Sequence, residues 1–535
     1  MANVLDYIPG VYHAAIADGS INIDLAEYLA DAFAAASNAT VTFPVGTYTL
    51  TTFALPANST LLTDGPGTVF KQLGSAASID PVLLIRNASN VTVESCTIVG
   101  IIASWEIDGS EFNHGIAIEA RNGETARNIR IGDITARNIR GDGVYIINWL
   151  GGLVAGITIG DVFGDNVLRN IVGIVGGRDI DIGNIDGTAA GYSTLDLEPE
   201  GSYSEGVDGV TVRSVRGNLC QVAANPDTFV RNVRIDRLDT DPGYTADSTP
   251  PYERNALSPV SLHRTDAGLA LRNAERVWIG HHRARGHTHH AVMFVPDAPS
   301  PAPFVTDPTI EIGSVDYTSI GAADSTYYTL IKALGMRQVV VRGGVYTVLS
   351  DAQSLIHGSS SSPWTECLVE QVRGNGLVAK WINRGRFTGV AVNAPSSRGA
   401  FQNLSNCLVA NARIAAGYLG YNVADSFVEL TDFDMVAGGS YVLGGASPGV
   451  RFRKSGIDGA FVEDGMIGSE ALPNIGWNAA MGTANKGSYA VYAGQNVGSS
   501  YSQVEAQETD DAVKAVAQRV KAIEDAARAL GDLRG

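Results

Sequence analysis

Two acidic residues, Asp196 and Glu198, lie two positions apart in an otherwise apolar stretch that runs from Leu195 to Pro199. On an extended strand, side chains two residues apart point to the same side, so both carboxylates face outward when Leu195 and Leu197 face inward. Such a pair can hydrolyse a glycosidic bond, because like charges close together keep one group protonated while the other is ionised. Asp196 and Glu198 are therefore our candidate acid and base, and the alternative is a pair of solvated acids on an outer strand.

Other residues come to the same side of the protein if the repeats described below are stacked coils. Asp142 would lie about 10 Å, or two coils, from Asp196, and it is the third catalytic candidate, although its flanking glycines also fit a simple turn. Tyr145 and Arg169 are expected between these two acids. Aromatic rings can stack on sugar faces, with core packing as the alternative. The candidate substrate-binding residues are Glu119, Tyr145, Trp149, Arg169 and Tyr192.

A short pattern recurs nine times between residues 88 and 341: a small or polar residue, followed by apolar, polar and apolar residues. The irregular spacing is typical of a repeat protein with loop insertions. The alternation within each repeat predicts strands rather than helices, and Gly or Asn at the corners accepts left-handed backbone angles. The first apolar residues of the nine repeats are Val91, Ile129, Ile157, Ile180, Val210, Val233, Val277, Ile310 and Val339.

Strand-containing repeats of roughly 20 to 30 residues are typical of a parallel β-helix, in which each coil stacks on the one before it. We therefore predict an all-β fold, an elongated right-handed parallel β-helix, over residues 51–345. Residues 1–50 are expected to form an N-terminal segment with a capping helix over 24–37. In that helix Asp24 would be the N-cap, and Leu25, Leu29, Ala32, Phe33 and Ala36 would share the apolar face.

The entry segment resembles a known group of proteins. Asp6-Tyr7-Ile8-Pro9, the predicted helix and the following Phe43-Pro44-Val45-Gly46-Thr47-Tyr48 are similar to the start of pectate-lyase-like β-helix domains in bacteriophage tailspikes and capsule depolymerases. The resemblance covers roughly residues 6–345 and includes the amino-acid sequence of Leu195–Pro199. It implies a homotrimer on the virion tail, in contact with phage tail or baseplate proteins, that binds and cleaves a bacterial surface polysaccharide.

Two alternatives to glycoside hydrolysis stay open at this point. A polysaccharide lyase of the same fold would act by β-elimination on a uronic acid polymer, with a basic strip that includes Arg264 and the histidine-rich segment 281–290. A non-catalytic receptor-binding tail fibre would use the same surface for attachment only. In segment 281–290, His287 and His289 could hold zinc or supply a base, but a solvent-facing turn is the commoner explanation.

The last part of the chain changes character twice. Residues 346–505 keep an irregular apolar alternation and are expected to be β-rich, either as further coils or as a separate sandwich. Residues 506–535 place apolar side chains at spacings of three and four, which predicts a short coiled-coil helix. That helix could join three chains or dock on its own chain.

Composition restricts the partners. A net charge of −18 opposes nucleic acid and favours neutral substrates. We expect no membrane span, because no run of 18 uncharged apolar residues occurs, and the first residues do not look like a signal peptide. The four cysteines are far apart and are expected to be buried free thiols. No metal or cofactor motif is recognisable, although calcium between Asp133, Asp161 and Asp186 stays a conjecture.

Overall fold

The computed structural model describes most of the first of two compact units, Met1–Pro473 and Asn474–Gly535, and none of the second. The described residues are 1–74, 80–102, 113–149, 151–187, 190–199, 206–224, 228–241, 267–285, 290–294, 309–318, 330–332, 338–348, 353–358, 366–395, 399–435, 443–444 and 451–454. The predicted helix at 506–535 lies outside these residues.

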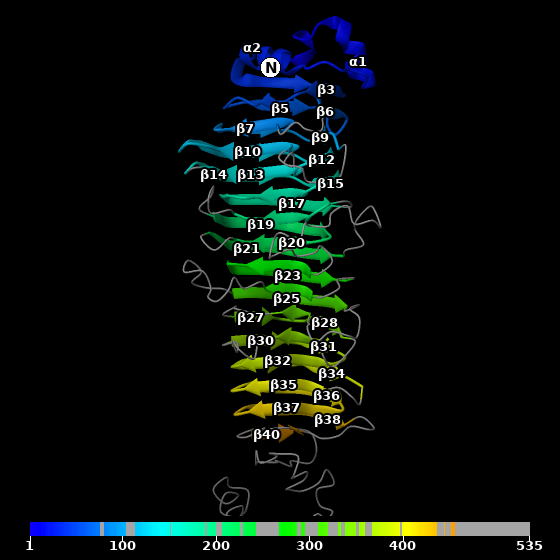
Figure 1. The fold of residues 1–535 in the computed structure, drawn as a ribbon, viewed down its shortest axis with the longest axis vertical. Helices are drawn as coiled ribbons and strands as arrows, with labels where there is room; N and C mark the ends of the chain where they lie inside the picture. The colour runs from blue at the N-terminus through cyan, green and yellow to red at the C-terminus, as the bar shows by residue number, and fades with distance from the viewer. Residues whose placement is uncertain are drawn as a thin grey trace, which may run out of the picture. The chain divides into compact units, whose positions relative to one another are not determined.

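The first unit is a parallel β-helix, as predicted (Figure 1). Every pairing between strands is parallel in the described residues, and the strands form two sheets that wrap one apolar interior. The larger sheet, sheet A, takes one or two strands from each coil, and the smaller sheet, sheet B, takes one. Parallel pairing throughout is what stacked coils require, because each turn of the chain runs over the last in the same direction.

Sheet B has 15 strands in the described residues. They are β4 (Phe53–Ala54), β7 (Leu83–Arg86), β10 (Ile116–Ala120), β13 (Val144–Asn148), β16 (Val172–Ile174), β18 (Leu195–Leu197), β20 (Cys220–Ala223), β22 (Ala267–Arg272), β24 (His290–Phe294), β26 (Ile331–Lys332), β29 (Ser354–His357), β32 (Leu377–Asn383), β35 (Gly399–Ser405), β37 (Tyr418–Ala424) and β39 (Leu443–Gly444).

Sheet A has 25 strands in the same part of the chain. They are β1 (Ala2–Asn3), β2 (Thr40–Phe43), β3 (Gly46–Leu50), β5 (Thr60–Thr63), β6 (Thr68–Gln72), β8 (Val91–Val93), β9 (Cys96–Val99), β11 (Thr125–Ile131), β12 (Ile134–Ile139), β14 (Leu153–Ile159), β15 (Val162–Val167), β17 (Gly177–Gly187), β19 (Gly206–Gly217), β21 (Phe229–Thr240), β23 (Ala274–Ala284), β25 (Thr309–Thr318), β27 (Gln338–Val341), β28 (Gly344–Thr347), β30 (Glu366–Glu370), β31 (Val372–Gly374), β33 (Gly385–Thr388), β34 (Ala391–Asn393), β36 (Leu408–Ala416), β38 (Phe427–Met435) and β40 (Arg451–Lys454).

The nine sequence repeats stack in register in sheet A. Each repeat's first apolar residue pairs with that of the next, from Val91 beside Ile129 through to Ile310 beside Val339. All nine of these side chains are buried. The recurring pattern therefore marks equivalent positions in successive coils.

The residue before each of these apolar positions forms a corner of the coil. In seven of the nine repeats it has a positive φ, from 49° at Arg276 to 72° at Gly209. Asn and Asp tolerate this left-handed conformation better than other side chains, and Gly accepts it freely. Corner asparagines also form a ladder, in which Asn128 Nδ2 donates to Asn90 Oδ1 (3.1 Å) and Asn90 Nδ2 donates to Asn58 Oδ1 (2.8 Å).

Helix α2 (Ala26–Ala35) lies at the N-terminal end of the stack, together with α1 (His13–Asp18) (Figure 1). It packs Phe33 against the rings of Phe43 and Phe53, with centroids 6.3 and 5.7 Å apart. The predicted cap is thereby present, with one difference. Leu25 is the N-cap residue, and Asp24 lies one position earlier, where Oδ1 still accepts a hydrogen bond from the Ala26 amide (3.1 Å).

Beyond residue 345 the strands β29 to β40 extend the same two sheets. The described part of the expected β-rich region 346–505 thus consists of further coils. All four cysteines are buried free thiols, as predicted. None of the helices in the described residues has the length and hydropathy that a bilayer crossing requires.

Candidate active site

Asp196 lies on the outer face of strand β18 in sheet B, and Glu198 directly follows the end of that strand at Leu197. Leu195 and Leu197 are fully buried in the apolar interior, so the alternating residues Asp196 and Glu198 point away from it. The Glu198 amide continues the ladder by donating to Ile174 O (3.1 Å), so both acids are held by strand geometry. The expected outward pairing is present.

The neighbours of Asp196 on the outer face follow from strand register. Asp196 pairs with Gln221 on one side and with Gly173 on the other, and Gly173 pairs with Tyr145. Because Gly173 has no side chain, a gap opens in this row between Tyr145 and Asp196. The Asp142 carboxylate fills it: its Oδ2 lies 2.8 Å from the position that a Cβ on residue 173 would take.

Asn170 connects the two aspartates. Its backbone amide donates to Asp142 Oδ1 (2.9 Å), and its side-chain Nδ2 donates to Asp196 Oδ2 (3.1 Å). Its Oδ1 accepts from the amide (3.2 Å) and hydroxyl (2.7 Å) of Ser193. All of these groups are buried, so Asn170 fixes the position of both carboxylates.

In each aspartate, the hydrogen bonds described above involve one carboxylate oxygen and leave the other out. Asp142 Oδ2 and Asp196 Oδ1 are buried, and neither has a hydrogen-bond partner in the part of the chain that the structure describes. Buried carboxylate oxygens are normally paired, because leaving one unpaired costs free energy. Each of these two oxygens retains the capacity to accept a hydrogen bond.

Burial changes the ionisation of both aspartates. Desolvation, followed by the nearby Glu198 carboxylate, raises the pKa of Asp196 well above its usual range. Desolvation also raises the pKa of Asp142, while Arg169, whose Nε lies 3.7 Å from Asp142 Oδ1, opposes the shift. Asp196 is therefore the carboxyl group best suited to hold a proton at neutral pH.

Glu198 has a different environment. Its side chain is 27% exposed, and Oε1 lies 3.7 Å from Arg272 Nη2, an opposite charge that favours the carboxylate form. The two acids of the candidate pair thus have unequal surroundings. One is buried and the other is partly solvated beside a guanidinium.

His114 supports Asp142 from the preceding coil. The Asp142 amide donates to His114 Nδ1 (2.9 Å), which requires that nitrogen to be unprotonated. Burial lowers the pKa of His114 well below its usual range, so the imidazole is neutral. Its ring stacks on Tyr145 with centroids 4.0 Å apart.

The exposure of Asp196 differs from the expectation of acids that face water. Asp196 is 3% exposed, and its row neighbours Tyr145 and Gln221 are 7% and 3% exposed. An apolar cluster of Leu84, Ala117, Tyr145 and Ile147 also lies on this outer face. Outward direction and solvent exposure are therefore separate properties here, since Tyr145, Asp196 and Gln221 point outward and are nevertheless buried.

The candidate substrate-binding residues are only partly brought together. Arg169 lies against Asp142, as described above, and Asn170 rather than Tyr145 connects the two aspartates. Both oxygens of Glu119 are occupied by the side chains of Arg86 and Arg121.

The three aromatic candidates lie on the same wall. Tyr145 is stacked on His114. Trp149 packs against the outer apolar cluster, with the Arg121 guanidinium 5.3 Å from its ring centroid. Tyr192 is partly exposed, and its amide donates to Arg169 O (3.0 Å).

The sequence reasoning missed three members of the site: His114, Asn170 and Gly173. Asn170 directly follows the candidate residue Arg169, and Gly173 lies three residues further on, so their positions could have been noticed. Their roles depend on side-chain directions at coil corners, which strand alternation does not predict.

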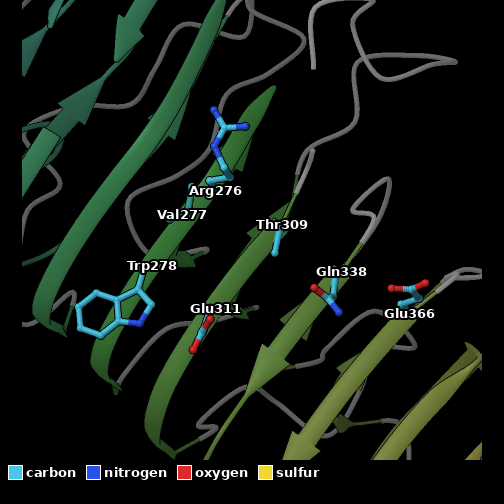
Figure 2. Close-up of a pocket in the computed structure, with 7 residues that line it drawn as sticks. All are labelled: Arg276, Val277, Trp278, Thr309, Glu311, Gln338 and Glu366. Carbon is cyan, nitrogen blue, oxygen red and sulfur yellow. The ribbon is translucent and has the colours of Figure 1, made fainter. Parts of the chain in front are cut away.

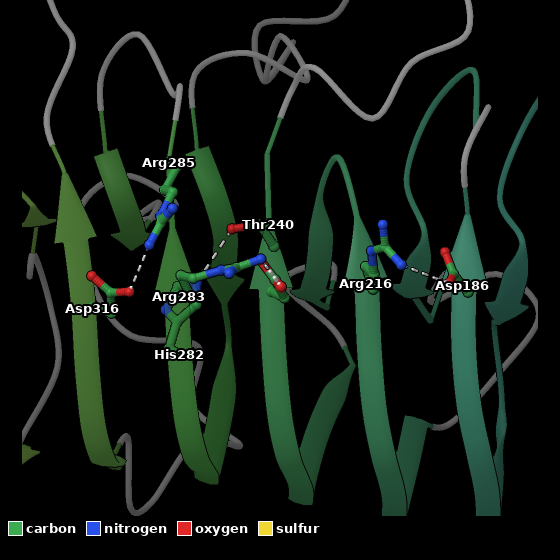
Figure 3. Close-up of polar contacts among 8 residues, drawn as sticks. Asp186, Arg216, Thr240, His282, Arg283, Arg285 and Asp316 are labelled. Atoms are coloured by element: carbon green, nitrogen blue, oxygen red, sulfur yellow. Dashed lines mark hydrogen bonds and ion pairs between the residues drawn. The ribbon is translucent and has the colours of Figure 1, made fainter.

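The histidine-rich segment serves another purpose where the structure describes it. His282 is buried inside the coil, where Nδ1 contacts Tyr317 Oη (2.8 Å) and Nε2 contacts Thr240 Oγ1 (3.4 Å). Figure 3 shows His282 and Thr240 beside ion pairs between neighbouring strands, including Arg285 with Asp316 (3.0 Å) and Arg216 with Asp186 (3.4 Å). His287 and His289 lie outside the described residues. Within those residues no three His, Cys, Asp or Glu side chains are placed to hold a metal ion.

Comparison with known proteins adds similarity in overall arrangement only. No protein-family model and no curated protein sequence matches the chain.

Three solved structures illustrate the similarity. The A-module of a mannuronan C-5 epimerase from Azotobacter vinelandii is 13% identical, with a TM-score of 0.26, over 85% of this chain and 95% of that one. A surface adhesin of Streptococcus pneumoniae is 13% identical, with a TM-score of 0.29, over 86% and 94%. The catalytic unit of an α-1,3-glucanase from Streptomyces thermodiastaticus is 12% identical, with a TM-score of 0.30, over 85% and 69%. Similarity at this level carries no information about the chemistry of this chain.

Proposed function

We propose that this protein hydrolyses a bacterial surface polysaccharide, with Asp196 as the general acid and Glu198 as the base or nucleophile. The observation that carries the proposal is the pairing of two outward-pointing carboxyl groups, Asp196 on β18 and Glu198 directly after it, of which the first is buried and the second is partly solvated beside Arg272. Glycoside hydrolysis needs this division between a protonated and an ionised carboxyl group.

In the proposed reaction, the Asp196 carboxyl donates its proton to the glycosidic oxygen as the bond to the anomeric carbon breaks. Glu198 either removes a proton from the attacking water or attacks the anomeric carbon itself, after which water releases the sugar. In both routes one water is consumed, and each cleaved bond gives one new reducing end. The identity of the route depends on the separation of the carboxyl groups when substrate is bound.

Asp142 has a supporting part in this proposal. Its carboxylate, held by the Asn170 amide, adds to the electrostatic effects that raise the pKa of Asp196. A third carboxyl group beside the acid therefore helps to keep Asp196 protonated at the pH at which it must donate. Arg169, which lies 3.7 Å from Asp142 Oδ1, would help to hold this group in place, and Tyr145 would act indirectly through its stack on His114.

We further propose that the protein is a bacteriophage tailspike, that is, a homotrimer on the virion tail that contacts phage tail or baseplate proteins. Its support is the resemblance of the entry segment, from Asp6 to Tyr48, to such proteins. The net charge of −18 favours a neutral polymer over a polyanion.

A panel of purified capsules, exopolysaccharides and O-antigens tests the proposed activity. The expected result is a fall in polymer size with release of reducing ends and no rise in ultraviolet absorbance. Absorbance from an unsaturated product would indicate a lyase instead. Polymer binding with no loss of size would indicate a receptor-binding fibre.

A further inference from the structure

A pocket lies on the outer surface of sheet A, whereas Asp196 lies on sheet B. It has a volume of about 380 Å³ and spans four adjacent strands, β23, β25, β27 and β30 (Figure 2). The residues that line it are Arg276, Val277, Trp278, Thr309, Glu311, Gln338 and Glu366.

Two rows of side chains along the coils form this pocket. In one row Trp278 pairs with Glu311, and in the other Thr309 pairs with Gln338, which pairs with Glu366. Because neighbouring coils are about 4.8 Å apart, the second row spans roughly 10 Å along the stack. The pocket is therefore elongated in the direction in which a linear polymer would lie along the coils.

Several of the charged groups in the pocket are already engaged. Arg276 donates from Nε to Asn232 Oδ1 (2.8 Å) and from Nη1 to Glu275 Oε2 (3.0 Å). Glu311 Oε1 accepts from Arg342 Nε (2.6 Å). These pairs neutralise the guanidinium and one of the two carboxylates, which leaves Glu366 as the charge that a ligand would meet.

The groups left for a ligand are an amide, a carboxylate and an indole. Gln338 and Glu366 make no side-chain hydrogen bond or ion pair within the described ranges. Trp278 is held by the Arg234 guanidinium, whose Cζ lies 4.2 Å from the ring centroid. This stack fixes the indole at the edge of the pocket, where Trp278 is partly exposed.

This combination is suited to a hydroxyl-rich, uncharged ligand. The Gln338 amide both donates and accepts, and the Glu366 carboxylate accepts, which matches hydroxyl groups that can do either. Indole surface suits the C–H face of a sugar ring. A uronate or phosphate would be repelled by Glu366 and would find Arg276 already neutralised.

We propose that this pocket is a second glycan-binding site, which binds a segment of neutral oligosaccharide. The site rests on the proposed function only for the expectation that the bound glycan belongs to the polymer cleaved at Asp196. Two sites on one stack of coils would bind a long chain more tightly than either site alone.

The test uses the full chain with Asp196→Asn, so that a bound glycan is not cleaved. A glycan array of neutral and anionic bacterial polysaccharides is the probe. We expect binding to neutral glycans, a loss of about tenfold or more when Gln338→Ala and Glu366→Ala are added, and a similar loss with Trp278→Ala. Phe163→Ala, which removes an exposed aromatic ring from another coil of sheet A, is the matched control and should bind as the parent does.

Equal binding of neutral glycans by the pocket variants and the parent would overturn this proposal, as would binding confined to anionic glycans or absent altogether. The two proposals fail separately. Cleavage by the wild type with no effect of the pocket variants rejects only the second site. Pocket-dependent binding with no cleavage of any polymer rejects only the hydrolase.

Discussion

At the residue scale, the central feature is a carboxyl group, that of Asp196, whose pKa the fold raises. Asp196 is buried, and among the described residues its carboxyl group accepts a hydrogen bond only from Asn170 Nδ2 (3.1 Å). In the folded protein its pKa is raised, whereas in the unfolded chain it is close to the ordinary value of about 3.9. The folded state therefore holds this proton to a higher pH than the unfolded chain does.

This difference predicts how Asp196→Asn changes stability with pH. Above the ordinary carboxyl range the unfolded chain loses the proton first, so wild type loses stability as pH rises toward the raised pKa. The asparagine cannot ionise, so the variant should have the higher melting temperature at pH 7. The gap should close as pH falls to about 4. Thermal unfolding from pH 4 to 8 measures it.

The control for this prediction is Asp181→Asn, on an exposed outer position of β17. Because this side chain is exposed, the substitution should change stability by less than about 0.5 kcal/mol. A constant loss of stability in Asp196→Asn at every pH would contradict the raised pKa.

Gly173 gives a second prediction at the same scale. In Gly173→Ala the added Cβ would lie 2.8 Å from Asp142 Oδ2, so the Asp142 carboxyl group would have to move, whereas Asn170 Nδ2, at 3.5 Å, would be at an ordinary contact distance. We expect a stability cost of about 1–3 kcal/mol, typical of overpacking. Displacement of the Asp142 carboxyl group should lower kcat on the order of 10²-fold.

Steady-state kinetics and thermal unfolding check this variant. Gly10→Ala is the control, because its added Cβ meets no atom within 4 Å. Normal kcat in Gly173→Ala would show that the position of Asp142 is unimportant for turnover.

The candidate site was only partly predictable from sequence at this scale. Alternation in Leu195–Pro199 predicted that Asp196 and Glu198 point outward, because side-chain direction on a strand has period two. It could not predict their unequal burial, which depends on neighbours from other coils. Asn170 was missed for the same reason, since it acts through contacts across coils.

At the element scale, the coil corner is the unit that the repeats specify. Asn128 has φ 56° and donates from Nδ2 to Asn90 (3.1 Å). Asn128→Ala removes this ladder bond and leaves a residue that adopts the left-handed conformation at a cost of about 1–2 kcal/mol. We expect a loss of stability of about that size or slightly more.

Denaturant unfolding of Asn128→Ala beside Arg130→Ala tests this expectation. Arg130 is an exposed residue on the same strand, and its substitution should change stability by less than about 0.5 kcal/mol. Equal effects of the two substitutions would mean that the corner conformation contributes nothing to stability.

Strand positions were predictable from the repeats, whereas strand extent was not. The first apolar residues of all nine repeats pair in register, as their spacing suggested. The pattern did not distinguish coils with two short strands in sheet A, such as β14 and β15, from coils with one long strand, such as β19. That difference depends on whether the backbone bends between the two halves, and inserted loops give no periodic signal.

At the scale of the whole molecule, stacked coils provide long side walls with separate sites. The candidate active site is on sheet B, and the pocket beside Trp278 is on sheet A. Each coil contacts mainly its neighbours, so residues far apart in the sequence meet only through stacking. This explains why the sequence predicted the fold class more completely than it predicted either site.

The acidic character of the chain also belongs to this scale. A net charge of −18 makes long-range attraction of a polyanion unfavourable. We therefore propose that both sites recognise a neutral polymer through short-range contacts.

The measurement that tests the central claim most directly is reducing-end release from the cleaved polymer by wild type, Asp196→Asn and Glu198→Gln. Loss of general acid or base catalysis should lower the rate by about 10²–10⁴-fold in each variant, while Asp181→Asn keeps the wild-type rate. If the combined Asp196→Asn and Glu198→Gln variant cleaves as fast as wild type, these carboxyl groups do not carry the reaction.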